Sequence, residues 1–341
     1  MPFLPTGEQR DFGRSLDALL TAAGTPAVAR AWAAGDPGPG LALWRRLAMS
    51  GVFTLAVPEA YEGAGPLPVE LAVACVELGR HGVPGPFVET VAASALLAEL
   101  ARRGEDGPAK RLLPGLATGG TVATLAVLPG DAHVDRPGTP SRYALDADVA
   151  GVTLVVQGDA LRFATGHGPV RASADPVRRL ASPSPEGEPL ASGPAVVAAA
   201  SHAVDWALLA TAAQSLGVGL ALLDRTVAYA KRRTQFGAAI GSFQAVKHRL
   251  ADTLLGLEFA RPLVFGAALT FDGADLAAAK VSAGEAAYAA ARTALQTHGA
   301  VGYTEELDLS LWLRKARPLR DAWGTPSWCR ARVLAATGAR G

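Results

Sequence analysis

Residues 229–252 read Tyr229-Ala-Lys-Arg-Arg-Thr-Gln-Phe-Gly-Ala-Ala-Ile-Gly-Ser-Phe-Gln-Ala-Val-Lys-His-Arg-Leu-Ala-Asp252. This stretch separates two long apolar segments, one that begins at Ala195 and one that continues to Thr270. The basic, glycine-containing piece between them predicts a loop that joins two long helices, with Ser242 as the N-cap of the second. Long helices joined by short loops lie antiparallel, so the stretch predicts a helical bundle.

The rest of the C-terminal part continues this pattern. Asp272-Gly273 and Gly299-Ala-Val-Gly302 predict turns. Further helices are expected over residues 274–296, 304–320 and 326–337. Residues 198–341 are therefore predicted to form a C-terminal bundle of four or five helices.

A different character marks the middle of the chain. From Thr121 to Val197, glycine, proline and β-branched residues dominate, and short apolar runs replace the helical spacing. Strands are predicted over residues 121–128, 151–156 and 160–164. We expect residues 119–197 to form a reduced β domain, since so short a segment can build only a small sheet or barrel.

Helical periodicity governs the first hundred residues. Thr6 stands three residues before Gln9, which is the spacing of a capping box. An N-terminal helical domain is expected over residues 1–118, with helices from Thr6 and over 41–50, 68–79 and 88–103. The fold class is thus mainly α with a small central β domain, and the order of helices, strands and helices narrows the fold considerably.

The composition excludes several kinds of partner. The 341 residues include 32 basic and 31 acidic ones, and the formal net charge is +1. Neither nucleic acid nor an anionic membrane is expected to bind such a chain. The apolar stretch 195–219 is interrupted by five polar residues, which argues for a buried helix and against a membrane span. With no signal-peptide pattern at its start, the chain is expected to be cytoplasmic.

Metal and disulfide sites are not indicated by the sequence. Cys75 and Cys329 lie far apart and outside any CxxC spacing, so both are expected to be small buried residues in a reducing compartment. The six histidines show no ligand spacing. We assign no metal.

Three stretches resemble the acyl-CoA dehydrogenase family. The first is the opening stretch, in which Arg233, Phe236-Gly237 and Phe243-Gln244 fall where the family has arginine, phenylalanine-glycine and phenylalanine-glutamine. The second is Gln296-Thr-His-Gly-Ala-Val-Gly-Tyr303, and the third is the tail from Trp312 to Thr325. The resemblance implies a helical N-terminal domain, a central β domain, a C-terminal four-helix bundle, and FAD as the cofactor.

In this family the arginine and glutamine motifs reach across a dimer interface to the FAD of the neighbouring subunit. The subunit's own FAD is held by the strand domain and by residues around the glycine-threonine pair of the tail. The chemistry of these side chains supports such a role. The planar guanidinium of an arginine can donate two hydrogen bonds to a pyrophosphate, and the amide of a glutamine can both donate and accept. The cofactor-binding residues implied by the resemblance are Arg233, Gln235, Phe236, Gln296, Gly299 and Thr325.

The sequence departs from the family at the catalytic base. Dehydrogenation needs a carboxylate that removes the α-proton of the acyl thioester. Trp323 stands where most members have this glutamate, and Ala207 stands where a minority have it. Asp205 lies two residues from Ala207, so it is turned to a different face of its helix, where it could serve simply as a charge near the helix start. Leu208 replaces a family arginine. No catalytic residue is predicted.

The strand domain departs as well. Residues 125–133 keep only a proline and a glycine of the family's flavin-flanking loop. The motifs that would contact a neighbouring subunit's FAD are thus present, whereas several residues that would hold the chain's own FAD are missing. Some actinobacterial dehydrogenases are similar, because they pair two short subunits of which one lacks the base; the base-deficient subunit has a tail like Gly324-Thr-Pro-Ser327.

Three hypotheses follow. The first is a non-catalytic subunit that completes a partner's FAD site for acyl-CoA thioesters; the partner is a second dehydrogenase-like subunit, or the chain itself as a homo-oligomer. FAD would then be shared at the interface and could be absent from the isolated chain. The second is a pathway-specific enzyme with altered, flavin-independent chemistry such as dehydration or cyclisation, with Asp205, His202 or Glu306 as acid or base. The third is a scaffold that binds nothing.

Overall fold

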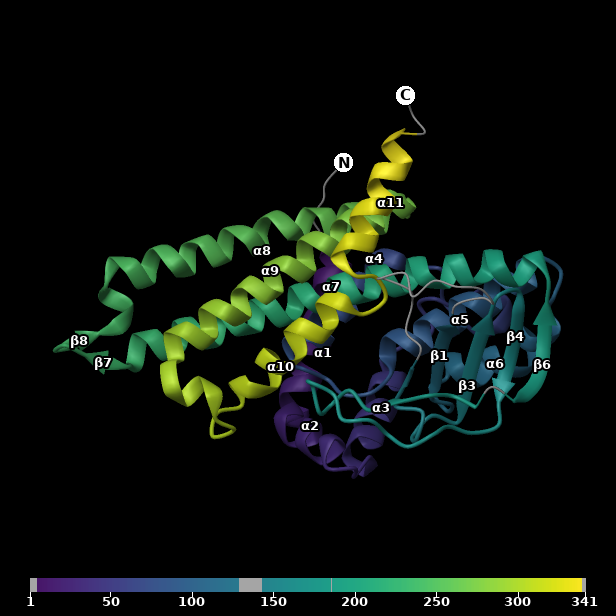
Figure 1. Cartoon of the computed structure of the whole chain (residues 1–341), viewed down its shortest axis with the longest axis horizontal. Coiled ribbons are helices and arrows are strands. Elements are labelled where there is room, and N and C mark those ends of the chain that lie inside the picture. Colours follow the sequence, from purple (N-terminus) through teal and green to yellow (C-terminus); the bar gives the residue numbers. More distant parts are fainter. Residues whose placement is uncertain (1–4, 129–142, 185, 339–341) are drawn as a thin grey trace.

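The structure is a computed structural model of the chain, and it describes residues 5–128, 143–184 and 186–338. Helices form the N-terminal part, a small sheet follows, and helices return to the end (Figure 1). This order confirms the predicted fold class, a mainly α protein with a small central β domain. The predicted domain limits at residues 118 and 197 stay predictions.

The N-terminal part begins with the capping box that the sequence predicts. The Thr6 hydroxyl accepts a hydrogen bond from the backbone N–H of Gln9, and the Gln9 side chain accepts one from the backbone N–H of Thr6. Two helices, α2 and α6, were not predicted. The six helices are α1 (Gly7–Ala23), α2 (Thr25–Ala33), α3 (Gly38–Met49), α4 (Pro68–Arg80), α5 (Phe87–Arg102) and α6 (Gly107–Ala117), with a short η1 (Glu59–Tyr61).

The sheet has the strand order β1-β3-β4-β6. β1 (Ala123–Leu128) pairs parallel with β3 (Val152–Gln157), and β4 (Ala160–Ala164) pairs antiparallel with β3 and with β6 (Gly187–Ser192). A separate short pair joins β2 (Ala144–Leu145) and β5 (Leu180–Ala181). Helix α5 packs against β1, where the Thr90 hydroxyl donates a hydrogen bond to the Ala123 carbonyl.

The C-terminal bundle is built around α7 (Pro194–Arg232), which packs against α4, α5, α8, α9 and α10. Beyond the body, α7 and α8 project together as an arm whose tip is a β7–β8 hairpin (Figure 1). The remaining elements are β7 (Thr234–Gln235), β8 (Ala238–Ala239), η2 (Ile240–Ser242), α8 (Gln244–Thr270), α9 (Gly273–His298), η3 (Gly299–Tyr303), α10 (Leu309–Asp321) and α11 (Pro326–Gly338).

One predicted cap in the bundle is wrong. The N-cap of α8 is Phe243, and the Ser242 hydroxyl instead donates to the carbonyl of Ala239. Ser242 belongs to the 3₁₀ turn that precedes the helix, so its side chain bonds backward along the chain. Asp272, predicted only as part of a turn, is the residue that caps α9.

Two helices, α7 and α8, are long and apolar enough to span a membrane. The most apolar 18-residue stretch of α7 is completely buried inside the protein. This agrees with the prediction of a buried helix, which was based on the polar residues that interrupt the stretch. The corresponding stretch of α8 is only 44% buried. The hydrophobicity of α7 is therefore explained by the core, whereas that of α8 is not.

Buried carboxylates tie the three parts of the molecule together. Asp146, just after β2, accepts a hydrogen bond from the indole N–H of Trp32 on α2, at 3.0 Å. Asp175, in the loop before β5, pairs with Lys315 of α10, with 3.2 Å between Nζ and Oδ2. Each bond holds a segment of the β part against a helix of another part. Because these groups are shielded from water, removing one partner leaves a polar group unsatisfied.

Asp146 predicts an unusual pH dependence of stability. Burial raises the pKa of its carboxyl from 3.8 to about 7, although the Trp32 hydrogen bond lowers it. The folded protein then binds the proton more tightly than the unfolded chain, so the free energy of unfolding falls as the pH rises from about 4 to 7. An Asp146→Asn variant keeps an acceptor for Trp32 and removes the titration. Its stability relative to the wild type should rise across this range by on the order of 1–3 kcal/mol in urea unfolding. A difference that is constant with pH would contradict this account.

Candidate functional site

Trp323, which stands at the predicted position of the missing base, lies in the turn between α10 and α11. Its side chain is 5% exposed, and its backbone φ is 57°, a left-handed conformation that large residues rarely adopt. The indole Nε1 donates a hydrogen bond to Oε1 of Glu89 on α5, at 3.0 Å. Glu89 is itself 4% exposed. A buried indole, hydrogen-bonded to a carboxylate of helix α5, therefore stands at the position that the sequence predicts for the family's proton acceptor.

The surrounding turn is held by two further features. The Lys280 ammonium, buried in α9, donates to the carbonyls of Leu319 and Arg320 at 2.9 and 2.8 Å and so fixes the end of α10. Gly324 follows Trp323, and a Cβ there would lie 2.9 Å from the Cys329 sulfur. The turn thus requires glycine at this position, and the placement of Trp323 is determined by packing on both sides.

A cavity of about 230 Å³ adjoins this pair. Its polar lining comes from Glu89, Tyr143, Ser173, Arg178 and Asp321, with Trp323 as one wall. Cavities that enclose drug-sized ligands measure about 300–1,000 Å³. The cavity beside the indole is smaller than this range, so a large ligand held there would need space beyond the cavity. Most of the predicted loop at residues 125–133 lies outside the described residues.

Asp205 and its neighbours are engaged in other contacts. The Asp205 carboxylate accepts from Arg332 of α11 at 2.6 Å, and burial raises its pKa despite this pair. Burial also lowers the pKa of His202, whose Nε2 accepts from the Trp206 indole at 3.0 Å. Ala207 is fully buried. The candidate acid–base groups near the start of α7 thus serve α11 and an aromatic cluster.

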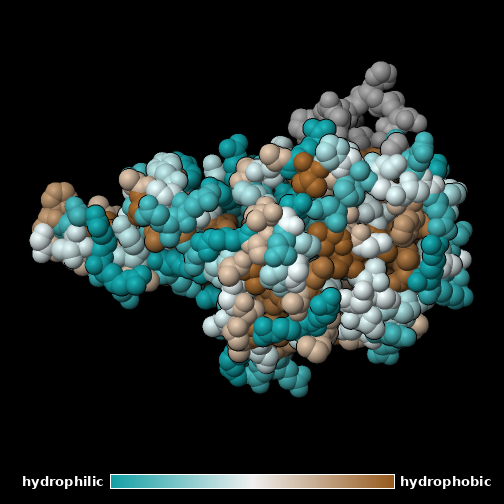
Figure 2. All heavy atoms as spheres, turned by 90° about the horizontal axis from the view of Figure 1, so that it is seen from below, coloured by the Kyte–Doolittle hydropathy of each residue, from teal (hydrophilic) through white to brown (hydrophobic). Residues whose placement is uncertain are grey.

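The predicted cofactor residues fall into separate places. Arg233, Gln235 and Phe236 form the exposed tip of the arm, and Phe236 is 94% exposed. Figure 2 shows apolar atoms at this far end. Gln296 and Gly299 are exposed at the end of α9, whereas Thr325 starts α11, well away from the arm tip (Figure 1). The hydroxyl of Thr325 accepts from the backbone N–H of Trp328 as a helix cap.

The arm tip is suited to a ligand that another chain carries. Arg233 offers five N–H donors to an anion, and Lys231 and Arg232 beside it are also exposed. These residue types fit the pyrophosphate and polar edges of a dinucleotide. Since the tip projects from the body, such a dinucleotide would be approached from outside this subunit (Figure 1).

An apolar stripe runs along α8 on the same arm. Phe259 is 72% exposed, and four leucines of the helix are about half exposed. A contiguous apolar surface of this kind usually marks a site of protein association. The stripe consists of Leu254, Leu255, Phe259, Leu263 and Leu269.

The sequence predicts the loop at the tip of the arm, and the base positions stay predictions; Glu89 was not predicted. A glutamate on a helix is normally solvated, and nothing in the local pattern of α5 distinguishes Glu89 from such a residue. Only its packing against the distant Trp323 makes it part of the site.

Comparison with known proteins gives two family profiles. Residues 6–120 match "Acyl-CoA dehydrogenase, N-terminal domain", and residues 197–336 match "Acyl-CoA dehydrogenase, C-terminal domain". The chain is 33% identical over 315 residues to acyl-CoA dehydrogenase IpdE2 of Mycobacterium tuberculosis, which covers 92% of each protein. It is 31% identical to IpdE2 of Mycolicibacterium smegmatis over 94% of this chain and 96% of that protein.

Solved structures give the same picture. The Tcur3481-Tcur3483 steroid acyl-CoA dehydrogenase G363A variant superposes with a TM-score of 0.82 at 26% identity, covering 98% of this chain and 99% of that one. The ChsE4-ChsE5 complex from Mycobacterium tuberculosis has a TM-score of 0.77 at 23% identity, over 99% of both chains. This second likeness bears on the fold alone.

The bond between Trp323 and Glu89 can be tested by a double-mutant cycle. Trp323→Phe removes the donor and leaves the buried carboxylate unsatisfied, so the free energy of unfolding should fall by about 1–3 kcal/mol. In a Glu89→Gln background the same change should cost less, because no charge remains unpaired. Urea unfolding of the four proteins gives the coupling. Equal costs in both backgrounds would show that the hydrogen bond contributes nothing.

Proposed function

The chain belongs to the acyl-CoA dehydrogenase family, and on that premise we propose that it is the base-deficient subunit of a heteromeric dehydrogenase. In this role it does not remove the α-proton itself. It presents its arm to a second, catalytic subunit and completes the FAD site there. The substrate of the complex is an acyl-CoA thioester, and the complex acts in the cytoplasm.

The observation that carries the proposal is the indole at the base position. FAD, when bound, accepts the hydride, but the reaction also needs a carboxylate beside the α-carbon. Trp323 is buried there, and the nearest buried acid, Glu89, accepts the hydrogen bond of its indole. An indole N–H is a donor only, so this side chain cannot take up a proton.

The exposed arm supports the second half of the proposal. Arg233 and Gln235 lie at a tip that the chain's own body leaves uncovered (Figure 1). Arg233 would hold the partner's pyrophosphate with charge-assisted hydrogen bonds, and Gln296 would supply further polar contacts. Phe236 would be buried on association.

The relatives support a partner of a different kind from the chain itself. The name Tcur3481-Tcur3483 gives two subunits for a related dehydrogenase structure. We infer the same arrangement here. No specific observation supports an enzyme of altered chemistry or a scaffold that binds nothing. Two acid–base candidates of the former are engaged in other contacts, since Asp205 is paired with Arg332 and His202 accepts a hydrogen bond from Trp206.

Purification of the chain alone and with the dehydrogenase-like protein encoded beside it tests the proposal. The lone chain should lack flavin absorbance and activity, whereas the complex should contain FAD and oxidise an acyl-CoA. In the complex, Arg233→Ala should weaken FAD binding about tenfold or more, since a charged hydrogen bond contributes about 1.5–3 kcal/mol. Arg45→Ala is the control, because it removes an exposed arginine of α3, outside the arm. A lone chain that binds FAD and forms the enoyl product would overturn the proposal.

The apolar stripe of α8 predicts the strength of the association. Phe259→Glu places a charge in a surface that must be desolvated, so complex formation should weaken by at least about tenfold. Met49→Glu is the control, because Met49 is an equally exposed apolar side chain of α3, away from the arm. Light scattering after size-exclusion chromatography measures both. Loss of the complex with Met49→Glu, or its full retention with Phe259→Glu, would exclude α8 as the interface.

A further inference from the structure

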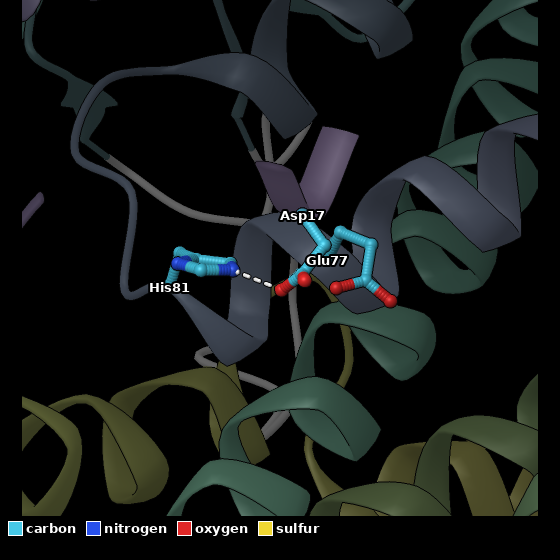
Figure 3. Close-up of side chains that lie close together, drawn as sticks. All are labelled: Asp17, Glu77 and His81. Atoms are coloured by element: carbon cyan, nitrogen blue, oxygen red, sulfur yellow. Dashed lines mark hydrogen bonds and ion pairs between the residues drawn. The ribbon is translucent and has the colours of Figure 1, made fainter. Parts of the chain in front are cut away.

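A cluster of potential metal ligands lies where α1 meets α4, in the N-terminal part. Glu77 and His81 stand four residues apart on the last turns of α4, and so they share one face of that helix. Asp17 reaches them from α1. Figure 3 shows the three side chains converging, with the Asp17 carboxylate beside the His81 ring and the Glu77 carboxylate next to it.

The distances suit a single cation. Asp17 Oδ1 lies 2.8 Å from His81 Nε2, and one ligand atom from each of the three residues lies within 4.8 Å of the others. Around a tetrahedral zinc ion with bonds of about 2.0–2.2 Å, ligand atoms stand about 3.3 Å apart. Small side-chain rotations bring the three atoms to that spacing, because all three side chains keep some exposure.

Glu77 supplies an independent sign of an unmet interaction. Its Oε2 is sealed from solvent and has no hydrogen-bond partner among the described residues. Burial raises the pKa of this carboxyl to about 7; Arg80 lowers it, and the nearby Asp17 charge raises it. Two carboxylates brought together and partly shielded from water repel each other unless a cation lies between them.

The charges of the neighbourhood set a limit on affinity. Arg80 Nε lies 3.8 Å from Glu77 Oε2, and the same guanidinium also pairs with Asp224. An arriving metal must displace this weak contact. A cavity of about 370 Å³, lined by Asp17 and Glu77, gives the ion access from solvent and room for a water ligand. Four arginines also line this cavity, and their positive charge opposes the binding of a cation: Arg10, Arg14, Arg80 and Arg261. Arg261, like Arg80, lowers the pKa of Glu77.

We propose that Asp17, Glu77 and His81 form a binding site for a divalent transition-metal ion of the zinc class, which fastens α1 to α4. One imidazole and two carboxylates are a ligand set that zinc accepts, and a water completes the coordination. The spacing of the histidines had given no reason to expect a metal, because two of the three ligands are acids and one comes from another helix. The site is independent of the dehydrogenase chemistry.

Metal titration of the chelator-treated full chain tests this site. Zn²⁺ should bind one-to-one and raise the midpoint of thermal unfolding by several degrees, since it binds the folded state alone. Co²⁺ should bind in its place and give the visible absorption of a low-coordinate cobalt ion. Glu77→Gln and His81→Gln should each weaken binding by at least about tenfold, because loss of even an outer-shell partner costs about 10–100-fold.

Matched variants separate a specific site from general effects. His248→Gln removes an exposed histidine of α8 and should leave binding unchanged. Arg80→Gln removes the competing guanidinium and should strengthen it. For each variant, the midpoint of thermal unfolding is compared with and without zinc, so a difference in stability between the variants does not affect the result. No saturable binding at micromolar zinc, or equal binding by the wild type, Glu77→Gln and His81→Gln, would overturn the proposal.

Discussion

The hydrogen bond from the Trp323 indole to the Glu89 carboxylate connects the end of the C-terminal bundle to the first turn of α5, which itself lies against strand β1. Two other buried carboxylates act in the same way, Asp146 with Trp32 and Asp175 with Lys315. In each case the acid and its donor come from different parts of the chain. Buried acids of this kind are tolerated only when their donors are correctly placed, so they fix how helices and sheet are arranged around the cavity beside Trp323.

This arrangement separates two capacities that one subunit normally combines. The interior, where the chain would bind its own flavin and deprotonate a thioester, is narrowed by a large aromatic side chain and by polar groups that satisfy each other. The exterior keeps its charged and apolar groups uncovered along the arm. On the proposed function, loss of the first capacity would leave the second intact, because the arm is held by the core of α7 and not by the cavity.

The fold could be predicted where the pattern is long and regular. The long apolar stretch of α7 and the strands β1, β3 and β4 have the composition of buried elements, and all of them are found. Helices α2 and α6 were missed because Gly24 and Pro26 precede or open the first, and Pro114 lies inside the second. Proline is tolerated in a first turn, but in a sequence it reads as a breaker. Strand β6 was missed because none of its residues is buried, so it lacks an apolar alternation. The site shows the same division: motifs single out Trp323 and Arg233 as candidates, but the partner of Trp323 depends on tertiary packing that no local pattern encodes.

The arm has a further consequence that follows from its being a continuation of α7. This helix has 39 residues, and at 1.5 Å per residue it extends about 58 Å without interruption. Its first half is locked in the core, so the distance and the rotational phase of its tip are fixed by residue count. One inserted residue would turn the tip by about 100° and advance it by 1.5 Å. Most of α7 is buried as far as Leu223, so substitutions can accumulate only at exposed positions of its last turns, such as Asp224 and Lys231. Insertions and deletions in this helix would aim Arg233 away from any binding partner.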